Sequence, residues 1–163
     1  MKSFFQLLIL FTIFLFPSLL SATTLSVAER LELNQQHVAD MLAHPEVLVT
    51  ASGLGYQEIT AGTGARPSEL SSVQVYYHGR LLTGQTFDKQ LAPDEPLEFI
   101  LHQVISGWQE GLQLMREGGT ARLHIPPELA YGAHGVPGVP GVPPFSFLVF
   151  DIELIRVSGF RRD

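Results

Sequence analysis

The sequence LEFILHQVISGWQEGLQLMREGGTARLHI (residues 97–125) contains the pattern that decides the fold. Apolar side chains recur at every second position at both of its ends: Leu97, Phe99, Leu101, Ala121, Leu123 and Ile125. Alternation with a period of two is typical of strands that bury one face. The two ends of this stretch are therefore predicted to be strands.

The middle of the stretch has a helical repeat instead. The expected apolar face of this helix consists of Trp108, Leu112 and Met115. We expect Ser106 to cap the helix, with Gln109 as its capping-box partner, and Gly118-Gly119 to end it. Side chains as large as these need a surface to pack on, which a curved sheet would provide.

Strand patterns recur on both sides of this stretch. Their alternating apolar positions are Val73, Val75, Tyr77, Leu148, Phe150, Ile152 and Leu154. Several strands with one helix on one side predict an α+β architecture, which begins near Gly53.

The composition argues against several classes of protein. Hydrophobic residues make up 45% of the 163 residues and charged residues 16%, so the chain can bury a core and is not a disordered protein. A formal net charge of -6 argues against nucleic acid as a partner, because phosphate binding needs a basic surface. Because the chain has no cysteine, it has neither a disulfide nor a thiol nucleophile.

The first 22 residues have the layout of a secretory signal peptide. A basic start at Lys2 is followed by an almost wholly apolar run from Phe4 to Phe16 and by small residues up to Ala22, the expected last residue before cleavage. The alternative is an uncleaved membrane anchor, for which residues 4–20 lie near the lower limit of about 17 residues. Both interpretations place the folded part outside the cytoplasm, in the periplasm or secreted.

A helical segment is expected within residues 23–52. Apolar side chains recur at spacings of three and four, or their sums, at Leu25, Ala28, Leu31, Val38, Met41 and Leu42. His44-Pro45 is the expected stop, because the residue before proline avoids helical geometry. This helix either docks on the main domain, serves as a spacer, or pairs with a second copy, which makes the protein a monomer or a weak dimer.

Residues 126–146 form a long loop rich in proline and glycine. Pro126-Pro127 can begin a short turn that leads to Tyr131-Gly132, and Val-Pro-Gly then repeats between Gly135 and Pro144. Proline before glycine favours tight turns, so we expect a succession of turns here. Long loops inside a compact domain are often functional.

The candidate site is a set of aromatic and aliphatic residues with one acid among them: Tyr77, Phe87, Asp88, Val104, Ile105, Trp108, Tyr131 and Phe150. The six histidines have no metal-ligand spacing and are expected at the surface or at strand edges. An apolar site with few polar groups suits a reaction that needs no nucleophile, such as rotation about the peptide bond before proline. Neither a metal nor a cofactor is expected.

Four motifs carry a resemblance to a known family. They are VYYHGRLLTGQTFD (75–88), LEFILHQVISGWQEGLQLM (97–115), GTARLHIPPELAYG (119–132) and PPFSFLVFDIELI (143–155). Together with GLGYQEI (53–59), they resemble the FKBP-type peptidyl-prolyl isomerases over residues 53–157, which leaves residues 158–163 as a tail. The order of signal peptide, helical segment and FKBP domain is similar to the exported bacterial members related to macrophage infectivity potentiators.

The resemblance implies a curved antiparallel sheet, a half-barrel, which wraps around one short helix with a pocket between them. Trp108 would form the pocket floor, and its walls would be Tyr77, Phe87, Val104, Ile105 and Phe150. The implied ligands are proline-containing segments of exported proteins and macrolide inhibitors.

The resemblance also implies roles for the polar groups and for two peripheral residues. The Tyr131 hydroxyl and the Ile105 amide would donate to the substrate carbonyl, and Asp88 would be the acid at the rim. Leu97 falls where relatives often carry an aromatic residue, and Val142 would contact the ligand from the loop. Two alternatives stay open: Tyr131 could instead satisfy a loop carbonyl, and Asp88 could be a turn residue.

Two features depart from the family pattern beside the pocket mouth. The Val-Pro-Gly repeat lengthens the loop by about two residues against the family's usual length, and Phe145 stands where a polar residue is common. Both enlarge the apolar rim, so a second function is weighed: a holdase chaperone or a proline-motif binding module with little turnover.

Overall fold

The computed structural model describes residues 25–138 and 140–159, so the predicted signal peptide and residues 160–163 of the tail lie outside the described residues. The helices are α1 (Val27–Ala43) and α2 (Ser106–Leu114), with two 3-10 turns, η1 (Leu101–Gln103) and η2 (Pro127–Leu129). The strands are β1 (Leu48–Val49), β2 (Gly55–Thr60), β3 (Ser72–Leu81), β4 (Thr86–Gln90), β5 (Leu97–Ile100), β6 (Thr120–Ile125) and β7 (Leu148–Ser158).

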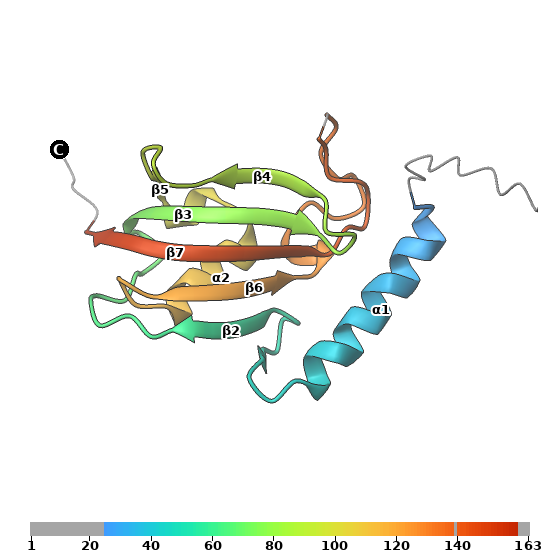
Figure 1. The fold of residues 1–163 in the computed structure, drawn as a ribbon, viewed down its shortest axis with the longest axis horizontal. Coiled ribbons are helices and arrows are strands. Elements are labelled where there is room, and N and C mark those ends of the chain that lie inside the picture. Colours follow the sequence, from blue (N-terminus) through green and yellow to red (C-terminus); the bar gives the residue numbers. More distant parts are fainter. Residues whose placement is uncertain (1–24, 139, 160–163) are drawn as a thin grey trace, which may run out of the picture.

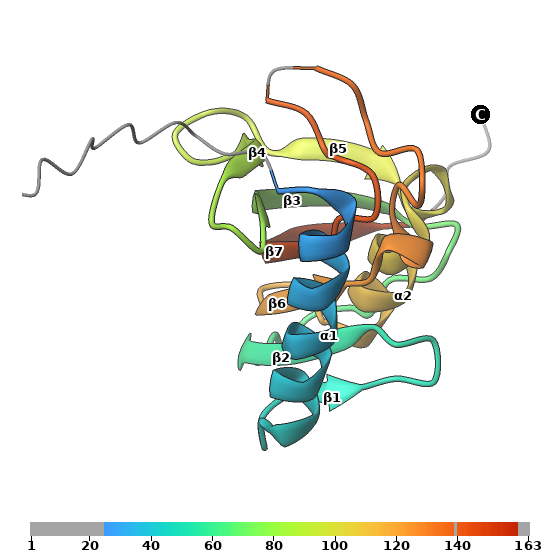
Figure 2. The same cartoon turned by 90° about the vertical axis from the view of Figure 1, so that its right-hand side faces the viewer.

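Among the described residues the strands form one seven-stranded antiparallel sheet. Six strands follow the order β1-β2-β6-β7-β3-β4, and the seventh, β5, pairs with β3. β3 pairs with β7 along one side, and its other side is shared by β5 near its start and β4 near its end. Figure 1 shows α2 against one face of this sheet, and Figure 2 shows α1 crossing the end of its strands. The expected α+β architecture, an antiparallel sheet with a short helix on it, is confirmed.

The core lies between α2 and the inner face of the sheet. Trp108 and Leu112 of α2 are buried, together with the alternating apolar residues of β3, β6 and β7. Two helical glycines let α2 approach closely, because a Cβ at Gly107 would lie 2.4 Å from Ile125 Cγ2, and one at Gly111 would lie 2.5 Å from Leu123 Cδ1. The sequence thus selects the only residue type that allows this spacing between helix and strand.

The expected caps of α2 are wrong at both ends. The N-cap residue is Ile105 rather than Ser106, which is the first helical residue, and no side chain caps the helix. Gln109 turns back to donate to the Val104 carbonyl at 2.7 Å. The helix ends at Leu114 rather than at the glycines, and Gly118 adopts its positive φ of 84° in the turn that leads to β6.

α1 forms close to its predicted place and docks on the sheet. A capping box between Ser26 and Glu29 starts it. Its docked face does not follow the apolar spacing, because Asn34 is buried while Leu31, Val38 and Leu42 are exposed. Of the predicted apolar positions, Met41 is buried, and the helix also uses polar side chains to pack.

The loop between η2 and β7 is built largely of turns, with one short bridge between Val136 and Val142. η2 begins at Pro127, where the sequence predicts a turn. Within the described residues, no helix has both the length and the apolar character needed to cross a membrane.

Candidate active site

Three aromatic side chains from three elements form the centre of the candidate site. Tyr77 of β3 lies edge-on to Trp108 of α2 with ring centroids 5.1 Å apart, and Phe150 of β7 lies edge-on to Trp108 at the same separation. All three are less than a tenth exposed. Edge-to-face contacts of this kind favour a fixed arrangement of rings, so the three aromatic side chains form one packed cluster, which we call the floor.

Half-buried side chains surround this floor. Phe87 of β4 lies 5.5 Å from Phe150 between ring centroids, and Phe99 of β5 lies 5.5 Å from Trp108. Val104, Ile105 and Tyr131 also pack partly against the core. A ligand above the floor would therefore meet apolar walls on several sides.

The hydroxyl of Tyr77 in this floor is already engaged. The Tyr77 hydroxyl donates a hydrogen bond of 2.8 Å to Oδ2 of Asp88, which is exposed on β4. Burial raises the pKa of Tyr77, and the hydrogen bond to Asp88 raises this pKa further. Tyr77 therefore stays protonated at neutral pH, and Asp88 lies in a strand rather than in a turn.

Besides the indole Nε1–H of Trp108, which is buried without a hydrogen-bond partner among the described residues, two donors are left for a ligand. Among the hydrogen bonds of the described residues, none involves the Tyr131 hydroxyl or the Ile105 amide. Burial, and then the charge of Asp88, raises the pKa of Tyr131, so its hydroxyl keeps its proton. Ile105 precedes the first turn of α2, where the N-terminal end of the helix adds positive potential.

The outer residues of the predicted site fall in different surroundings. Val142 is 5% exposed and belongs to the core cluster, while Leu97 is 40% exposed and is not among the side chains packed on it. Phe99, two positions along β5, lies against Trp108 instead. From the sequence, Phe99 is predicted only as a strand residue. The same alternation places Leu97 and Phe99 on one face of the strand, and this pattern could have marked Phe99 as a site residue.

The six histidines are predicted to lie at the surface or at strand edges, and this prediction is wrong for His37 and His124. His37 of α1 and His124 of β6 lie half-buried between the helix and the sheet, with 2.9 Å between Nε2 of the first and Nδ1 of the second. Burial lowers both pKa values, that of His124 to about 4. Nothing local in the sequence marks this pair, because 87 positions separate its members. In the part of the chain that the structure describes, no group of three or more metal-ligating side chains occurs.

A family model of FKBP-type peptidyl-prolyl cis-trans isomerases matches residues 64–155, which carry nearly all of this aromatic arrangement. The chain belongs to the FKBP family. Over 112 residues, 69% of this chain, it is 49% identical to the FKBP-type peptidyl-prolyl cis-trans isomerase FkpA of Escherichia coli. It is 45% identical to the macrophage infectivity potentiator of Trypanosoma cruzi over 117 residues, 71% of this chain and 59% of that protein.

Solved structures of FKBP proteins have the same fold. The crystal structure of E. coli FkpA superposes with a TM-score of 0.77 at 41% identity, covering 82% of this chain and 62% of that one. A peptidyl-prolyl cis-trans isomerase from Pseudomonas syringae superposes with a TM-score of 0.74 at 40% identity, covering 83% and 98%. The sequence match spans only 40% of the length of E. coli FkpA.

Proposed function

We propose that this FKBP protein is a peptidyl-prolyl cis-trans isomerase that accelerates rotation about X–Pro bonds without covalent chemistry. The single observation that supports this most is the buried floor of Tyr77, Trp108 and Phe150. Flat rings of this kind match the apolar ring of proline. The half-buried walls provide the desolvated surroundings that the reaction needs.

Desolvation supplies the catalytic effect in this proposal. Amide resonance sets a barrier of about 18–20 kcal/mol, and the planar, charge-separated form is better solvated than the twisted one. An apolar site therefore raises the planar ground state relative to the transition state. Each tenfold gain in rate requires about 1.4 kcal/mol, so a few such interactions are sufficient.

The polar groups would orient the substrate. Tyr131 and the amide of Ile105 supply free donors for the carbonyl before proline, while Asp88 holds Tyr77 in place through its hydrogen bond. Phe87 and Phe150 would contact the proline ring, and Phe99 would close the wall behind Trp108. Val104, Val142 and Leu97 would contact flanking parts of the peptide.

The proposal is tested by NMR exchange spectroscopy on an X–Pro peptide. We expect the protein to accelerate exchange, and the Tyr131→Phe, Phe150→Tyr double variant to lose most of that rate while it stays folded. Leu70→Ala, a change at an exposed apolar side chain outside the site, is the matched control. A wild-type rate equal to background, or an unchanged rate in the folded double variant, would reject the proposal.

A holdase or binding module is the second candidate function. Val136 is exposed and Phe145 half-exposed on the loop, and Val142 joins this loop to the core. Such a rim could grip unfolded chains. Suppression of aggregation that persists in the Tyr131→Phe, Phe150→Tyr variant would favour this function over the isomerase.

Three further proposals concern location and partners. The apolar run from Phe4 to Phe16, outside the described residues, supports export and hence substrates among exported proteins. The aromatic site supports binding of macrolide inhibitors, which should compete with an X–Pro peptide. Exposed apolar side chains on α1 support weak self-association through this helix.

A further inference from the structure

Helix α1 is hydrogen-bonded to the loop that joins Tyr131 to β7. Nη1 of Arg30 donates to the carbonyl of Pro144 at 2.9 Å, and Nδ2 of Asn34 donates to the carbonyl of Phe145 at 2.9 Å. More than 110 positions separate the partners of each bond. Figure 2 shows the upper half of α1 beneath this loop.

The segment that receives these bonds is under local backbone strain. Phe145 has a φ of 56°, the one positive value among the described residues other than glycine. A bulky side chain persists in this region only when its surroundings hold it there, at a cost of about 1–3 kcal/mol. Its amide donates to the Gly132 carbonyl at 2.8 Å and its carbonyl accepts from Asn34, so the residue is held on both sides.

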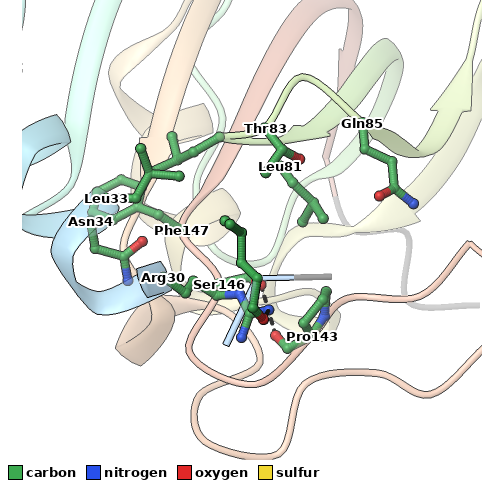
Figure 3. Close-up of a pocket in the computed structure, with 11 residues that line it drawn as sticks. Arg30, Leu33, Asn34, Leu81, Thr83, Gln85, Pro143, Ser146 and Phe147 are labelled. Atoms are coloured by element: carbon green, nitrogen blue, oxygen red, sulfur yellow. Dashed lines mark hydrogen bonds between the residues drawn. The ribbon is translucent and has the colours of Figure 1, made fainter. Parts of the chain in front are cut away.

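The packing between α1 and the loop is incomplete beside this segment. A pocket of about 180 Å³ lies between α1, the β3–β4 turn and the loop. Figure 3 shows Arg30 and Asn34 at its wall together with Pro143 and Ser146 of the loop, where Ser146 Oγ donates to the Pro143 carbonyl at 2.8 Å. Beside this pocket the two hydrogen bonds from α1 restrain residues 144 and 145 directly, while Phe147 further along the loop packs on His37.

The held segment is linked to the candidate active site in two ways, through its hydrogen bond to Gly132 and through the chain before Pro143. Gly132, which receives the Phe145 amide, follows Tyr131, and Val142 precedes the Pro143-Pro144 pair. A shift of the loop would therefore move Tyr131 and Val142 together.

We infer that Arg30 and Asn34 are positioning residues that set the affinity of the active site for proline peptides. The inference rests on the proposed function, since it assigns Tyr131 and Val142 to the substrate site. Arg30 and Asn34 act through the loop and touch no substrate. They should affect KM more than kcat, because the floor beneath the proline ring stays in place.

Other contacts keep α1 docked when these two bonds are removed. His37 packs on Phe147 with ring centroids 5.0 Å apart, and Met41 is 3% exposed. Oδ1 of Asn34 is buried without a hydrogen-bond partner among the described residues, so Asn34→Leu also removes an unsatisfied acceptor. The substitutions therefore test the loop and not the presence of the helix.

The experiment compares Arg30→Met, Asn34→Leu and the double variant by NMR exchange on an X–Pro tetrapeptide. The double variant also loses the bond from Arg30 to the Leu25 carbonyl at the start of α1. The loss of the two hydrogen bonds to the loop predicts a KM about three to ten times that of the wild type, with kcat within about twofold. Arg30→Lys with Asn34→Gln retains donors and should restore part of the affinity. Gln35→Leu, on the exposed side of α1, is the matched control.

An unchanged KM in the folded double variant, whatever the change in its thermal midpoint, would overturn the inference and leave a merely structural role. If the double variant does not fold, the KM of the Asn34→Leu single variant tests the inference, and an unchanged KM overturns it. If the wild type shows no turnover, the proposed function fails on its own. The positioning role is then judged by the peptide Kd from chemical-shift titration, and equal Kd values in wild type and variants would overturn it.

Discussion

Tyr77 donates its hydroxyl to Asp88, and this leaves Tyr131 as the tyrosine hydroxyl available to a ligand at the site. The two tyrosines share apolar surroundings, and in both burial raises the pKa above its ordinary value. Their roles nevertheless differ because only Tyr77 donates a hydrogen bond to the Asp88 carboxylate, whereas Tyr131 meets this carboxylate only through its charge. Residue type alone does not separate these roles.

The Tyr77–Asp88 bond should be measurable as a coupling. We expect Tyr77→Phe and Asp88→Ala each to lower the free energy of unfolding by about 1 kcal/mol and kcat/KM by a few fold. In a double-mutant cycle with urea denaturation and peptide exchange, the two changes together should cost hardly more than one alone. Fully additive effects would show that the bond contributes nothing.

Gly111 sets the distance between α2 and β6. A methyl group there would meet Leu123, and such overpacking costs about 1–3 kcal/mol. This cost exceeds the roughly 1 kcal/mol that alanine gains over glycine in a helix, so Gly111→Ala should lower the free energy of unfolding. Urea denaturation measures this difference. The matched control is Gly159→Ala, where no atom lies within 4 Å of the added Cβ, and an equal loss in both variants would contradict the close-packing explanation.

At the scale of elements, α1 is the part whose packing differs most from its sequence pattern. Its helical repeat predicts the helix itself, yet the side chains that meet the sheet and loop include Arg30, Asn34 and His37. These polar groups find partners in β6 and in the loop before β7. The helix is thereby joined to the domain by specific hydrogen bonds as well as by apolar contact.

The His37–His124 pair should make this docking sensitive to acid. Both folded-state pKa values lie below the unfolded value of about 6.5, so below this pH the unfolded chain binds protons that the folded chain does not. Asp40 favours the protonated form of His37 and Asp151 that of His124, while Arg122 and His44 oppose protonation of His124.

The stabilising effect of the pair is therefore fully present above pH 6.5 and is lost as the pH falls toward about 4. Allowing for partial solvation of the pair, the loss should reach about 2 kcal/mol in urea denaturation at a series of pH values. Because carboxylates also titrate in this range, the comparison is with a His37→Gln, His124→Gln variant, which should lose less. Parallel pH curves for the two proteins would rule out this role.

At the scale of the whole molecule, the exposed side of α1 carries a row of apolar residues that the domain does not cover: Val27, Leu31, Val38 and Leu42. They occupy one side of the helix, next to the docked face. Four side chains on one helix bury less than the roughly 1,600 Å² of a standard interface. Self-association through them should accordingly be weak.

Sedimentation velocity over a range of concentrations measures this association. We expect a monomer at low micromolar concentration and partial dimer formation near about 1 mM, which Leu31→Glu with Leu42→Glu should abolish. Leu70→Glu, a change at an equally exposed apolar residue outside α1, should leave it unchanged. A monomer at every concentration would end the proposal of pairing through α1.

Three features follow from the amino-acid sequence alone: the α1 segment, the strand–helix–strand core and the apolar composition of the site. Buried positions recur with a period of two in a strand and 3.6 in a helix, so a short stretch of sequence is enough to recognise these elements. Only the tertiary structure decided that Tyr77 bonds Asp88, that Phe99 rather than Leu97 meets Trp108, and that Asn34 reaches Phe145 across 111 positions. Such pairings depend on where the sheet brings distant segments together, and hydrogen-bond partners far apart in the chain leave no periodic pattern in it.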